Sequence, residues 1–204
     1  MKIFITGTDT NVGKTLICSW IALHTGFSYF KPIQTGTRDG SDSLEVQKLC
    51  KAKIYSEVYA YKEPLSPHLA SIIENDMIDI EKIILPPSCN LIIEGAGGVL
   101  VPINDTYLMV DLIKKLGAQV ILVARTTLGT INHTLLSLEA LRSRNIPVLG
   151  IIMNGEQNIH NSKAIEVWGR TSVLAEFPKL ESVSMDKLNH LALPQKLKQI
   201  LEVK

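Results

Sequence analysis

The residues of this chain that could most directly do chemistry lie in the segment GTDTNVGKT at positions 7–15. Apolar residues 3–5 before it predict a buried strand, and residues 16–23 after it predict a helix. A glycine turn between a strand and a helix directs backbone N–H groups and the positive helix end at one point, where they can hold a polyphosphate. In such a loop Lys14 reaches the outer phosphates and the Thr15 hydroxyl binds magnesium. The segment is therefore predicted to be a phosphate-binding loop.

The spacing of this loop is irregular. Counted back from Gly13, the usual G-x-x-x-x-G-K-S/T pattern has glycine at the position that Thr8 occupies here, and Gly7 lies one residue early. The irregularity separates the chain from generic nucleoside triphosphatases. We expect nucleotide contacts throughout the loop and the first helical turn, at Asn11, Val12, Gly13, Lys14, Thr15 and Leu16.

Two acidic residues are candidate magnesium ligands. Glu94 follows the apolar run 91–93, at the end of a predicted strand, and a carboxylate there can bind the ion directly or through water. Gly95, Ala96 and Gly97 follow it and are expected to approach the nucleotide. Asp42 is a second candidate, although an Asp before a helical segment is more often an N-cap.

Lys31 is the candidate for a second cation. It follows residues 27–30, Phe-Ser-Tyr-Phe, and precedes Pro32, so we expect it at a solvent-facing strand end. A cation opposite Lys14 would neutralise charge developing on a transferred phosphoryl group. Taken alone, a Lys-Pro pair at a strand end is usually a solvated turn. The occurrence of Lys14 and Glu94 at the same predicted sheet edge favours the functional interpretation.

A fourth segment, residues 128–132, lies where the run 120–124 gives way to a helix. Free N–H groups at such a helix start can bind a carboxylate. Thr130 as a simple helix cap is nearly as good an interpretation of the sequence. The five histidines are scattered without the spacing of metal ligands, so we expect structural or surface roles for them.

The elements that must position these residues alternate along the chain. Short apolar runs suited to strands covered on both faces are expected at residues 3–5, 91–93, 120–124 and 148–153. Apolar spacing near 3.6 predicts helices at about residues 43–51, 80–85, 108–116, 131–144 and 160–169. This order predicts one doubly wound α/β domain over residues 1–204, with a mostly parallel sheet and helices on both faces. Ligands of such folds bind beyond the carboxyl ends of strands. The polar stretch 38–43 is expected to be a surface loop.

Composition narrows the class of partner. The 204 residues are 46% hydrophobic, and 21 basic and 20 acidic residues give a formal net charge of +1. No electrostatic footprint for nucleic acid or an anionic membrane is evident, so a small-molecule partner is favoured. Only a short strand precedes the phosphate loop, which predicts no signal peptide, and no apolar run is long enough to span a membrane. Three widely spaced cysteines suit reduced thiols, and we expect a cytoplasmic protein.

Five segments together resemble the dethiobiotin synthetase family. They are the phosphate loop, Lys31-Pro32, the run EPLSPH at 63–68, EGAGG at 94–98 and GTINH at 129–133. Their order and approximate spacing match the family over residues 3 to about 155, and the GTDTxVGKT form of the loop is far more specific than a generic phosphate loop. After Asn154 the likeness fades.

The resemblance implies an ATP-dependent ligase with a phosphate-loop fold that closes the ureido ring of the biotin precursor. Its substrates would be 7,8-diaminononanoate, carbon dioxide or bicarbonate, and ATP, with magnesium required. Carbon dioxide would form a carbamate on one amine, the carbamate oxygen would take the γ-phosphoryl group, and the second amine would displace phosphate. No activated nucleophile is needed, which agrees with catalysis by positioning and electrostatics.

The resemblance also implies roles by position. Lys31 and Lys14 would be catalytic, Thr15, Asp42 and Glu94 would form the magnesium site, and Thr35 would contact the substrate. Gly129, Thr130, Ile131 and Asn132 match the helix start that, in the family's homodimer, receives the substrate carboxylate across the subunit interface. The base would lie near Asn154, Gly155, Pro178, Lys179 and Leu180.

The chain departs from the family pattern at two places. Asn11 stands where many members have glutamate, and Gly155 stands where Asp commonly follows Asn154. An Asp could accept hydrogen bonds from a base edge, whereas Gly155 offers only backbone. We therefore expect weak discrimination between ATP and other triphosphates.

The main alternative is a partitioning-type ATPase switch, which shares the fold and a variant phosphate loop. Those proteins carry a signature lysine where this chain has Asp9, and no amphipathic membrane segment is evident at residues 191–204. A GTPase switch is disfavoured because the Asn-Lys-x-Asp guanine motif is absent. A regulatory module without turnover stays open, although Lys31, Asp42 and Glu94 argue against it.

Overall fold

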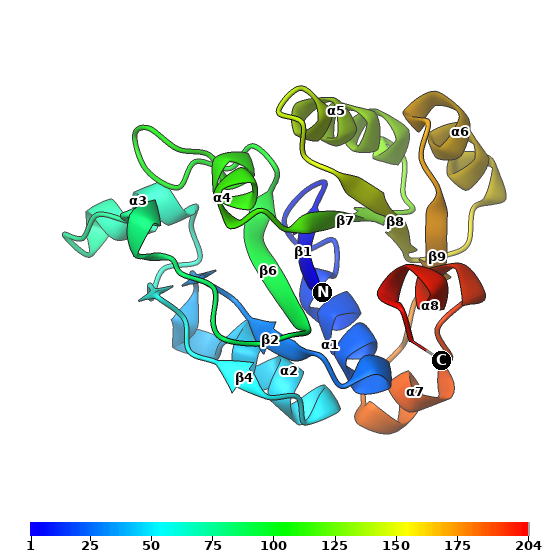
Figure 1. Cartoon of the computed structure of the whole chain (residues 1–204), viewed down its shortest axis with the longest axis horizontal. Coiled ribbons are helices and arrows are strands. Elements are labelled where there is room, and N and C mark those ends of the chain that lie inside the picture. Colours follow the sequence, from blue (N-terminus) through cyan, green and yellow to red (C-terminus); the bar gives the residue numbers. More distant parts are fainter. Residues whose placement is uncertain (204) are drawn as a thin grey trace.

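A seven-stranded parallel sheet forms the centre of the molecule in a computed structural model, which describes residues 1–203 (Figure 1). Every pair of neighbouring strands in it is parallel, which confirms the predicted α/β fold with a parallel sheet. Across the sheet, the strands follow the order β4 (Ile54–Tyr55), β2 (Ser28–Phe30), β6 (Leu91–Gly98), β1 (Lys2–Gly7), β7 (Gln119–Arg125), β8 (Val148–Asn154) and β9 (Val173–Phe177).

Helices cover both faces of this sheet, because successive side chains of each strand point to opposite sides. In β1, Phe4 belongs to one apolar core while Ile3 and Ile5 belong to the other. Seen in Figure 1, one face carries α4 (Met109–Leu116), α5 (Thr130–Arg142) and α6 (Ile159–Gly169). The other carries α1 (Lys14–Thr25), α2 (Asp42–Cys50), α7 (Met185–His190) and α8 (Gln195–Leu201). None of the helices in residues 1–203 is long and apolar enough to cross a membrane.

The chain between β2 and β6 adds α2 and β4 to the main sheet, and its remaining parts build a separate side wall. Strands β3 (Ile33–Gln34) and β5 (Tyr59–Ala60) form a small parallel sheet of their own. The 3-10 turns η1 (Thr37–Asp39) and η2 (Ile80–Lys82) and the helix α3 (Pro67–Ile73) complete this region. Figure 1 shows α3 at one end of the molecule, beyond the edge of the main sheet.

Three local predictions were wrong. The helix expected at 80–85 is only the short turn η2, because Pro86 and Pro87 follow and disfavour helical backbone before them. Strand β6 continues to Gly98 instead of ending at Glu94, so the glycine-rich segment is strand rather than loop. The expected surface loop at 38–43 contains η1 and the start of α2.

Candidate active site

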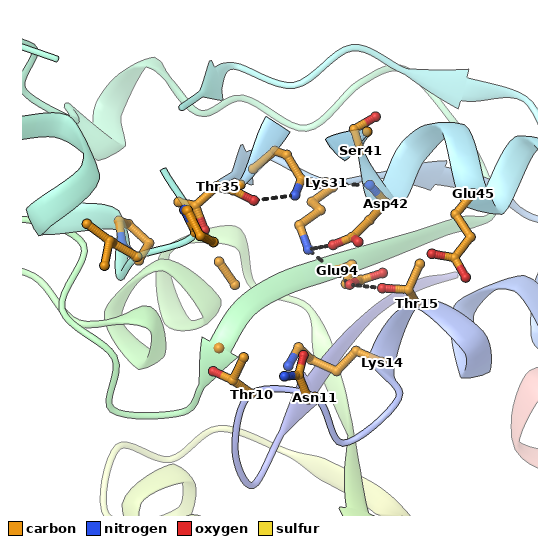
Figure 2. Close-up of a pocket in the computed structure, with 18 of the residues that line it drawn as sticks. Thr10, Asn11, Lys14, Thr15, Lys31, Thr35, Ser41, Asp42, Glu45 and Glu94 are labelled. Carbon is orange, nitrogen blue, oxygen red and sulfur yellow. Dashed lines mark hydrogen bonds and ion pairs between the residues drawn. The ribbon is translucent and has the colours of Figure 1, made fainter. Parts of the chain in front are cut away.

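A cavity of about 860 Å³ lies where the phosphate loop, β2, β6 and the side wall meet (Figure 2). It is the place that the sequence predicts for chemistry, beyond or beside the carboxyl ends of parallel strands. Its lining includes many of the predicted site residues, namely Asn11, Gly13, Lys14, Thr15, Lys31, Thr35, Asp42, Glu94, Ala96 and Gly97.

The phosphate loop has backbone that its residue types explain. Asn11 and Gly13 have φ angles of +58° and +93°, in the left-handed region that Asn and Gly tolerate best. This offers a physical reason for Asn11 at its position. A Cβ on Gly7 would lie 2.7 Å from the Val12 side chain and 2.8 Å from the Asp9 carbonyl oxygen. The early glycine of the irregular spacing is thus required by the close fold of the loop on itself.

Helix α1 begins inside the cavity without a side-chain cap, since its N-cap is Gly13. Backbone N–H groups at such a start suit an anion. The Asn154 carboxamide supports the loop from behind, where its Nδ2 donates to the Val12 carbonyl oxygen at 2.9 Å. A Cβ on Gly13 would lie only 2.1 Å from that Nδ2 atom, so the contact needs glycine there.

Asp9 holds the loop through an ion pair and through its backbone. Its Oδ2 accepts a hydrogen bond from Arg125 Nη2 at 3.0 Å, and its carbonyl oxygen accepts one from Lys14 Nζ at 3.1 Å. The position of the partitioning-type signature lysine is therefore occupied here by an acidic residue that is paired with Arg125 at the end of β7.

Lys31 lies at the centre of a buried charged cluster (Figure 2). Its ammonium donates to Glu94 Oε1 at 3.0 Å and also pairs with Asp42. Only 4% of Lys31 is exposed, so the predicted solvent-facing position was wrong. It is wrong because the loop after β2 folds back and brings α2, with Asp42, over the strand end. Burial disfavours the charged amine, but Glu94 and Asp42 outweigh it and raise the pKa of Lys31.

Glu94 is 1% exposed, and its two carboxylate oxygens accept three hydrogen bonds. Thr15 Oγ1 donates to Oε1 at 2.9 Å alongside Lys31, and the Tyr29 hydroxyl donates to Oε2 at 2.8 Å. Burial and the nearby Glu94 charge raise the pKa of Tyr29, so this hydroxyl stays a donor. The carboxylate is therefore held in one orientation, with Oε1 toward the phosphate loop.

Lys14 differs from Lys31 although both line the same cavity. Burial lowers the pKa of Lys14, Glu94 only partly offsets that effect, and the charge of Lys31 adds to it. Its ammonium donates to a backbone carbonyl rather than to a carboxylate. Lys14 is thus a buried cation short of negative partners, which is the electrostatic condition for binding a polyphosphate.

The oxygen atoms near Lys31 fit a magnesium ion shared with a nucleotide. In the part of the chain that the structure describes, no three His, Cys, Asp or Glu side chains gather closely enough to hold a metal alone. Mg²⁺ is usually bound by one or two carboxylates together with substrate phosphates. The Thr15 hydroxyl and the Asp42 and Glu94 carboxylates supply that donor set beside the phosphate loop.

Asp42 is not the N-cap of α2. Ser41 is, because its hydroxyl accepts the Leu44 N–H at 3.3 Å. Asp42 is the first helical residue, so its carboxylate is free of capping and turns to Lys31. The alternative interpretation of Asp42 as a cap was therefore wrong.

Several predicted contacts lie outside the cavity lining. Val12 and Leu16 pack into the apolar core, and a Cβ on Gly95 would meet the Phe4 ring at 2.8 Å, so Gly95 serves strand packing. The predicted base contacts follow β8 and β9 behind the phosphate loop, where the Gly155 N–H donates to Phe177 O at 3.0 Å and Lys179 pairs with Glu156. Pro178 is exposed and Leu180 is half-buried.

The start of α5 also lies apart from the cavity lining. Gly129, not Thr130, is its N-cap, so Thr130 does not cap the helix through its side chain. Gly129 and Asn132 are exposed and Ile131 is half-buried. Thr130 is 1% exposed, and its Oγ1 has no hydrogen-bond partner among the described residues. The structure of one chain does not bring this segment to Lys31.

Sequence reasoning missed three residues that shape the site: Tyr29, Gln34 and Arg125. Tyr29 had a signal, because a tyrosine that is buried in a strand needs a partner for its hydroxyl. Arg125 had one as well, since it is the polar residue at the carboxyl end of the run 120–124. Gln34 carried no signal beyond its position between Lys31 and Thr35, because its partners are backbone atoms.

Comparison with known proteins agrees with this geometry. A family model described as an AAA domain matches residues 1–187. The ATP-dependent dethiobiotin synthetase BioD of Lawsonia intracellularis is 54% identical over 203 residues, covering 100% of both chains. That of Paramagnetospirillum magneticum is 46% identical over 184 residues, covering 89% of this chain and 90% of the relative.

A solved structure shows the fold alone. The putative plasmid partition protein of Borrelia burgdorferi B31, bound to AMPPNP, has a TM-score of 0.53 at 13% identity, covering 98% of this chain and 94% of that one. This similarity reflects the shared layout of strands and helices, which many functions use. The identities over nearly full length are far higher with the synthetases, and this chain belongs to the dethiobiotin synthetase family.

Proposed function

We propose that this protein is an ATP-dependent dethiobiotin synthetase of biotin biosynthesis, formed by one phosphate-loop domain over residues 1–204. It would join 7,8-diaminononanoate and carbon dioxide and release ADP and phosphate. The observation that carries the proposal is the meeting of two lysines and two carboxylates, Lys14, Lys31, Asp42 and Glu94, in one cavity beside the phosphate loop. Relatives named for this activity are 54% and 46% identical to the chain.

The chemistry proceeds in three steps without a covalent bond to the protein. One substrate amine attacks carbon dioxide and loses a proton, which leaves a carbamate. The carbamate oxygen attacks the γ-phosphorus of ATP, and ADP leaves with the electrons of the broken P–O bond. The second amine then attacks the carbamate carbon, the ring closes, and phosphate leaves as the amine loses its proton.

Lys14 and Lys31 stabilise charge in the phosphoryl transfer. Lys14 contacts the outer phosphates from the loop, because it is a buried cation without a carboxylate bonded to it. Lys31 stays charged because its pKa is raised, and it reaches the transferred group from the opposite side. Both cations are already in place before the reaction, so little reorganisation is needed.

We propose Mg²⁺ as the metal, held by Thr15, Asp42 and Glu94. Bound there, the ion would supply positive charge that neutralises the phosphate groups. The chain's own contribution is orientation: Tyr29 and Thr15 fix the Glu94 carboxylate, and the first turn of α2 presents Asp42.

The substrate and the base are assigned to opposite ends of the site. We infer that Thr35 contacts the diamine and that the loop residues Asn11, Gly13 and Thr15 contact the phosphates, since all of them line the cavity. The segment 94–97 would face the phosphates through Ala96 and Gly97. The base would lie over Asn154, Gly155 and residues 178–180.

We propose a homodimer in the cytoplasm, without membrane or nucleic-acid partners. Because the start of α5 does not line the cavity of its own chain, residues 129–132 would receive the substrate carboxylate of a second copy.

The test is a substrate-dependent assay of the purified protein. With diaminononanoate, bicarbonate, Mg²⁺ and ATP, we expect dethiobiotin by mass spectrometry and an equal amount of released phosphate. Omitting the diamine should abolish phosphate release. Phosphate release that ignores the diamine, with no dethiobiotin formed, would contradict the proposal and favour a partitioning-type switch.

A further inference from the structure

The side chain of Gln34 connects the two ends of the loop that carries Thr35 and Asp42. Its Nε2 donates to the Thr35 carbonyl oxygen at 2.7 Å, and its Oε1 accepts the Asp42 backbone N–H at 3.1 Å. Gln34 is 5% exposed and lines the cavity. Figure 2 shows Thr35, Lys31 and Asp42 along the same part of the pocket. Both polar atoms of one buried side chain therefore join a residue on the substrate side to one on the metal side.

The Gln34 side chain can link the position of Asp42 to that of Thr35 because the Gln34 backbone is itself held in place. It ends β3, and its carbonyl oxygen accepts the Tyr61 N–H at 2.9 Å. The next residues are tied to the same wall, since the Gly36 N–H donates to Glu63 O at 2.9 Å and the Thr37 N–H donates to Tyr61 O at 3.0 Å. The carboxamide thus reaches from an anchored strand to the first residue of α2.

Two glycines set the path of the loop between these ends. Gly36 and Gly40 have φ angles of +78° and +120°, which glycine adopts without strain. At its far end the Asp42 carboxylate pairs with Lys31, so a ligand that fixes this carboxylate also fixes the backbone N–H that donates to Gln34. A shift at Asp42 then reaches Thr35 through a single side chain.

We propose that Gln34 is a positioning residue that couples occupancy of the nucleotide and metal site to the order of the substrate loop at residues 35–37. The proposal rests on the proposed function for the roles of Asp42 and Thr35. A coupling of this kind is reciprocal, so the diamine also strengthens binding of the nucleotide.

The first test needs no substrate. Amide hydrogen exchange at Gly36 and Thr37 is measured with and without Mg·ADP, by NMR or by mass spectrometry of a peptide over this segment. In the wild type we expect Mg·ADP to slow exchange about fivefold, the effect of one net hydrogen bond. Gln34→Met keeps the shape and removes both bonds, so it should lose this response. Gln47→Ala, an exposed glutamine on α2, is the matched control and should keep it.

A second variant separates coupling from folding. Gln34→Glu retains an acceptor for the Asp42 N–H, but once ionised it has no donor for the Thr35 carbonyl, so it should bind Mg·ADP and still fail to slow exchange at residues 36–37. The same response in Gln34→Glu and Gln34→Met as in the wild type would overturn the proposal. So would a wild type whose exchange ignores Mg·ADP.

Calorimetry then tests the reciprocal effect. In the wild type, Mg·ADP should tighten binding of diaminononanoate about fivefold, and Gln34→Met should reduce that factor to about one. Equal factors in both proteins would contradict the coupling. A wild type that binds Mg·ADP but no diamine would contradict the proposed function instead, and the exchange data would still decide the role of Gln34.

Discussion

The starts of α1 and α5 have nearly the same backbone but very different surroundings. Each helix follows an N-cap glycine, Gly13 with φ +93° and Gly129 with φ +91°, and neither has a side-chain cap. The start of α1 lies in the cavity with Lys14, Lys31 and Glu94. The start of α5 is exposed at Gly129 and lies outside that lining.

The backbone of a helix start is therefore not sufficient to make a catalytic site. Free N–H groups at a helix start attract an anion, but only the neighbouring charges decide which anion and what is done with it. At α1 one chain supplies those charges. At α5 it does not, and the proposed function requires a second chain to bring the ligand.

The largest effect is expected at the α1 side, from Lys31→Ala. Loss of the buried cation should lower kcat at least about a thousandfold, about 4 kcal/mol, because charge on the transferred group is no longer neutralised. Initial rates of dethiobiotin formation measure this, with Lys163→Ala as the control, since Lys163 is an exposed lysine on α6. Circular dichroism checks the fold. Turnover near the wild-type rate would remove Lys31 from the reaction.

The α5 side should show a smaller effect with a different signature. Asn132→Asp puts a negative charge at an exposed helix start, where it suits the helix but repels a substrate carboxylate. We expect KM for the diamine to rise about tenfold to a hundredfold, while KM for ATP stays unchanged. A rise in KM for ATP, or no change in either value, would contradict the assignment.

Mixed subunits sharpen the comparison. A dimer of one Lys31→Ala chain and one Asn132→Asp chain contains one site with both residues intact if the site is shared between chains. After random exchange, half of the dimers are mixed, so about a quarter of the wild-type rate should return when the diamine is kept well below the KM of the Asn132→Asp variant. A mixture no more active than the mean of the two variants would place the whole site in one chain.

The choice of nucleotide base tests the assignment of Gly155, and we expect it to change the rate less than the substitutions above. Gly155 has φ +138°, and a Cβ there would lie 2.4 Å from the Thr126 hydroxyl, so the commoner Asp does not fit without a shift. With backbone only at this position, GTP and CTP should support turnover within about tenfold of ATP, about 1.4 kcal/mol. Comparison of kcat/KM among the three nucleotides measures it. Strict dependence on ATP would show that other residues read the base.

Sequence patterns predicted the fold well because apolar runs and helical periodicity are local properties. They failed in segments whose sequence carries no clear strand or helix pattern. The strands of two residues in the side wall are fixed by their partners, and the helices after residue 177 carry too weak a periodicity. The apolar spacing at 80–85 is typical of a helix, but Pro86 limits the segment to the short turn Ile80–Lys82.

The candidate site was predictable in its residue types but not in its burial. Lys14, Thr15 and Glu94 follow from motif and strand position. The burial of Lys31 does not, because it depends on a loop that returns Asp42 from eleven residues away. No motif indicates Gln34, because its hydrogen-bond partners are backbone atoms of Thr35 and Asp42, and the contact with Asp42 depends on how the loop folds back.

The smallest expected effect is on the free energy of unfolding, and it should differ between substitutions at the starts of α1 and α5. The pKa of Lys14 is lowered, so the unfolded chain binds protons at this group more readily than the folded chain. The charged amine therefore destabilises the folded protein at pH values below the lowered pKa. This destabilisation disappears as the pH rises from there towards the ordinary lysine value. Lys14→Met should therefore raise the free energy of unfolding by about 1 kcal/mol near neutral pH, or about 2–4 °C in Tm, while nucleotide binding weakens.

Thermal unfolding without nucleotide, from about pH 7 towards about pH 10, measures this difference, which should narrow as pH rises. Lys31→Met should do the opposite. The pKa of Lys31 is raised, so its charge stabilises the fold fully below the ordinary lysine value, and that contribution is lost only as pH rises through the raised one. Asn132→Ala at the start of α5 should leave Tm unchanged, because no buried charge lies there to be relieved. If Lys14→Met is less stable than the wild type near neutral pH, favourable contacts stabilise the charged Lys14 in the free protein. That result would contradict the description of Lys14 as a buried cation short of negative partners.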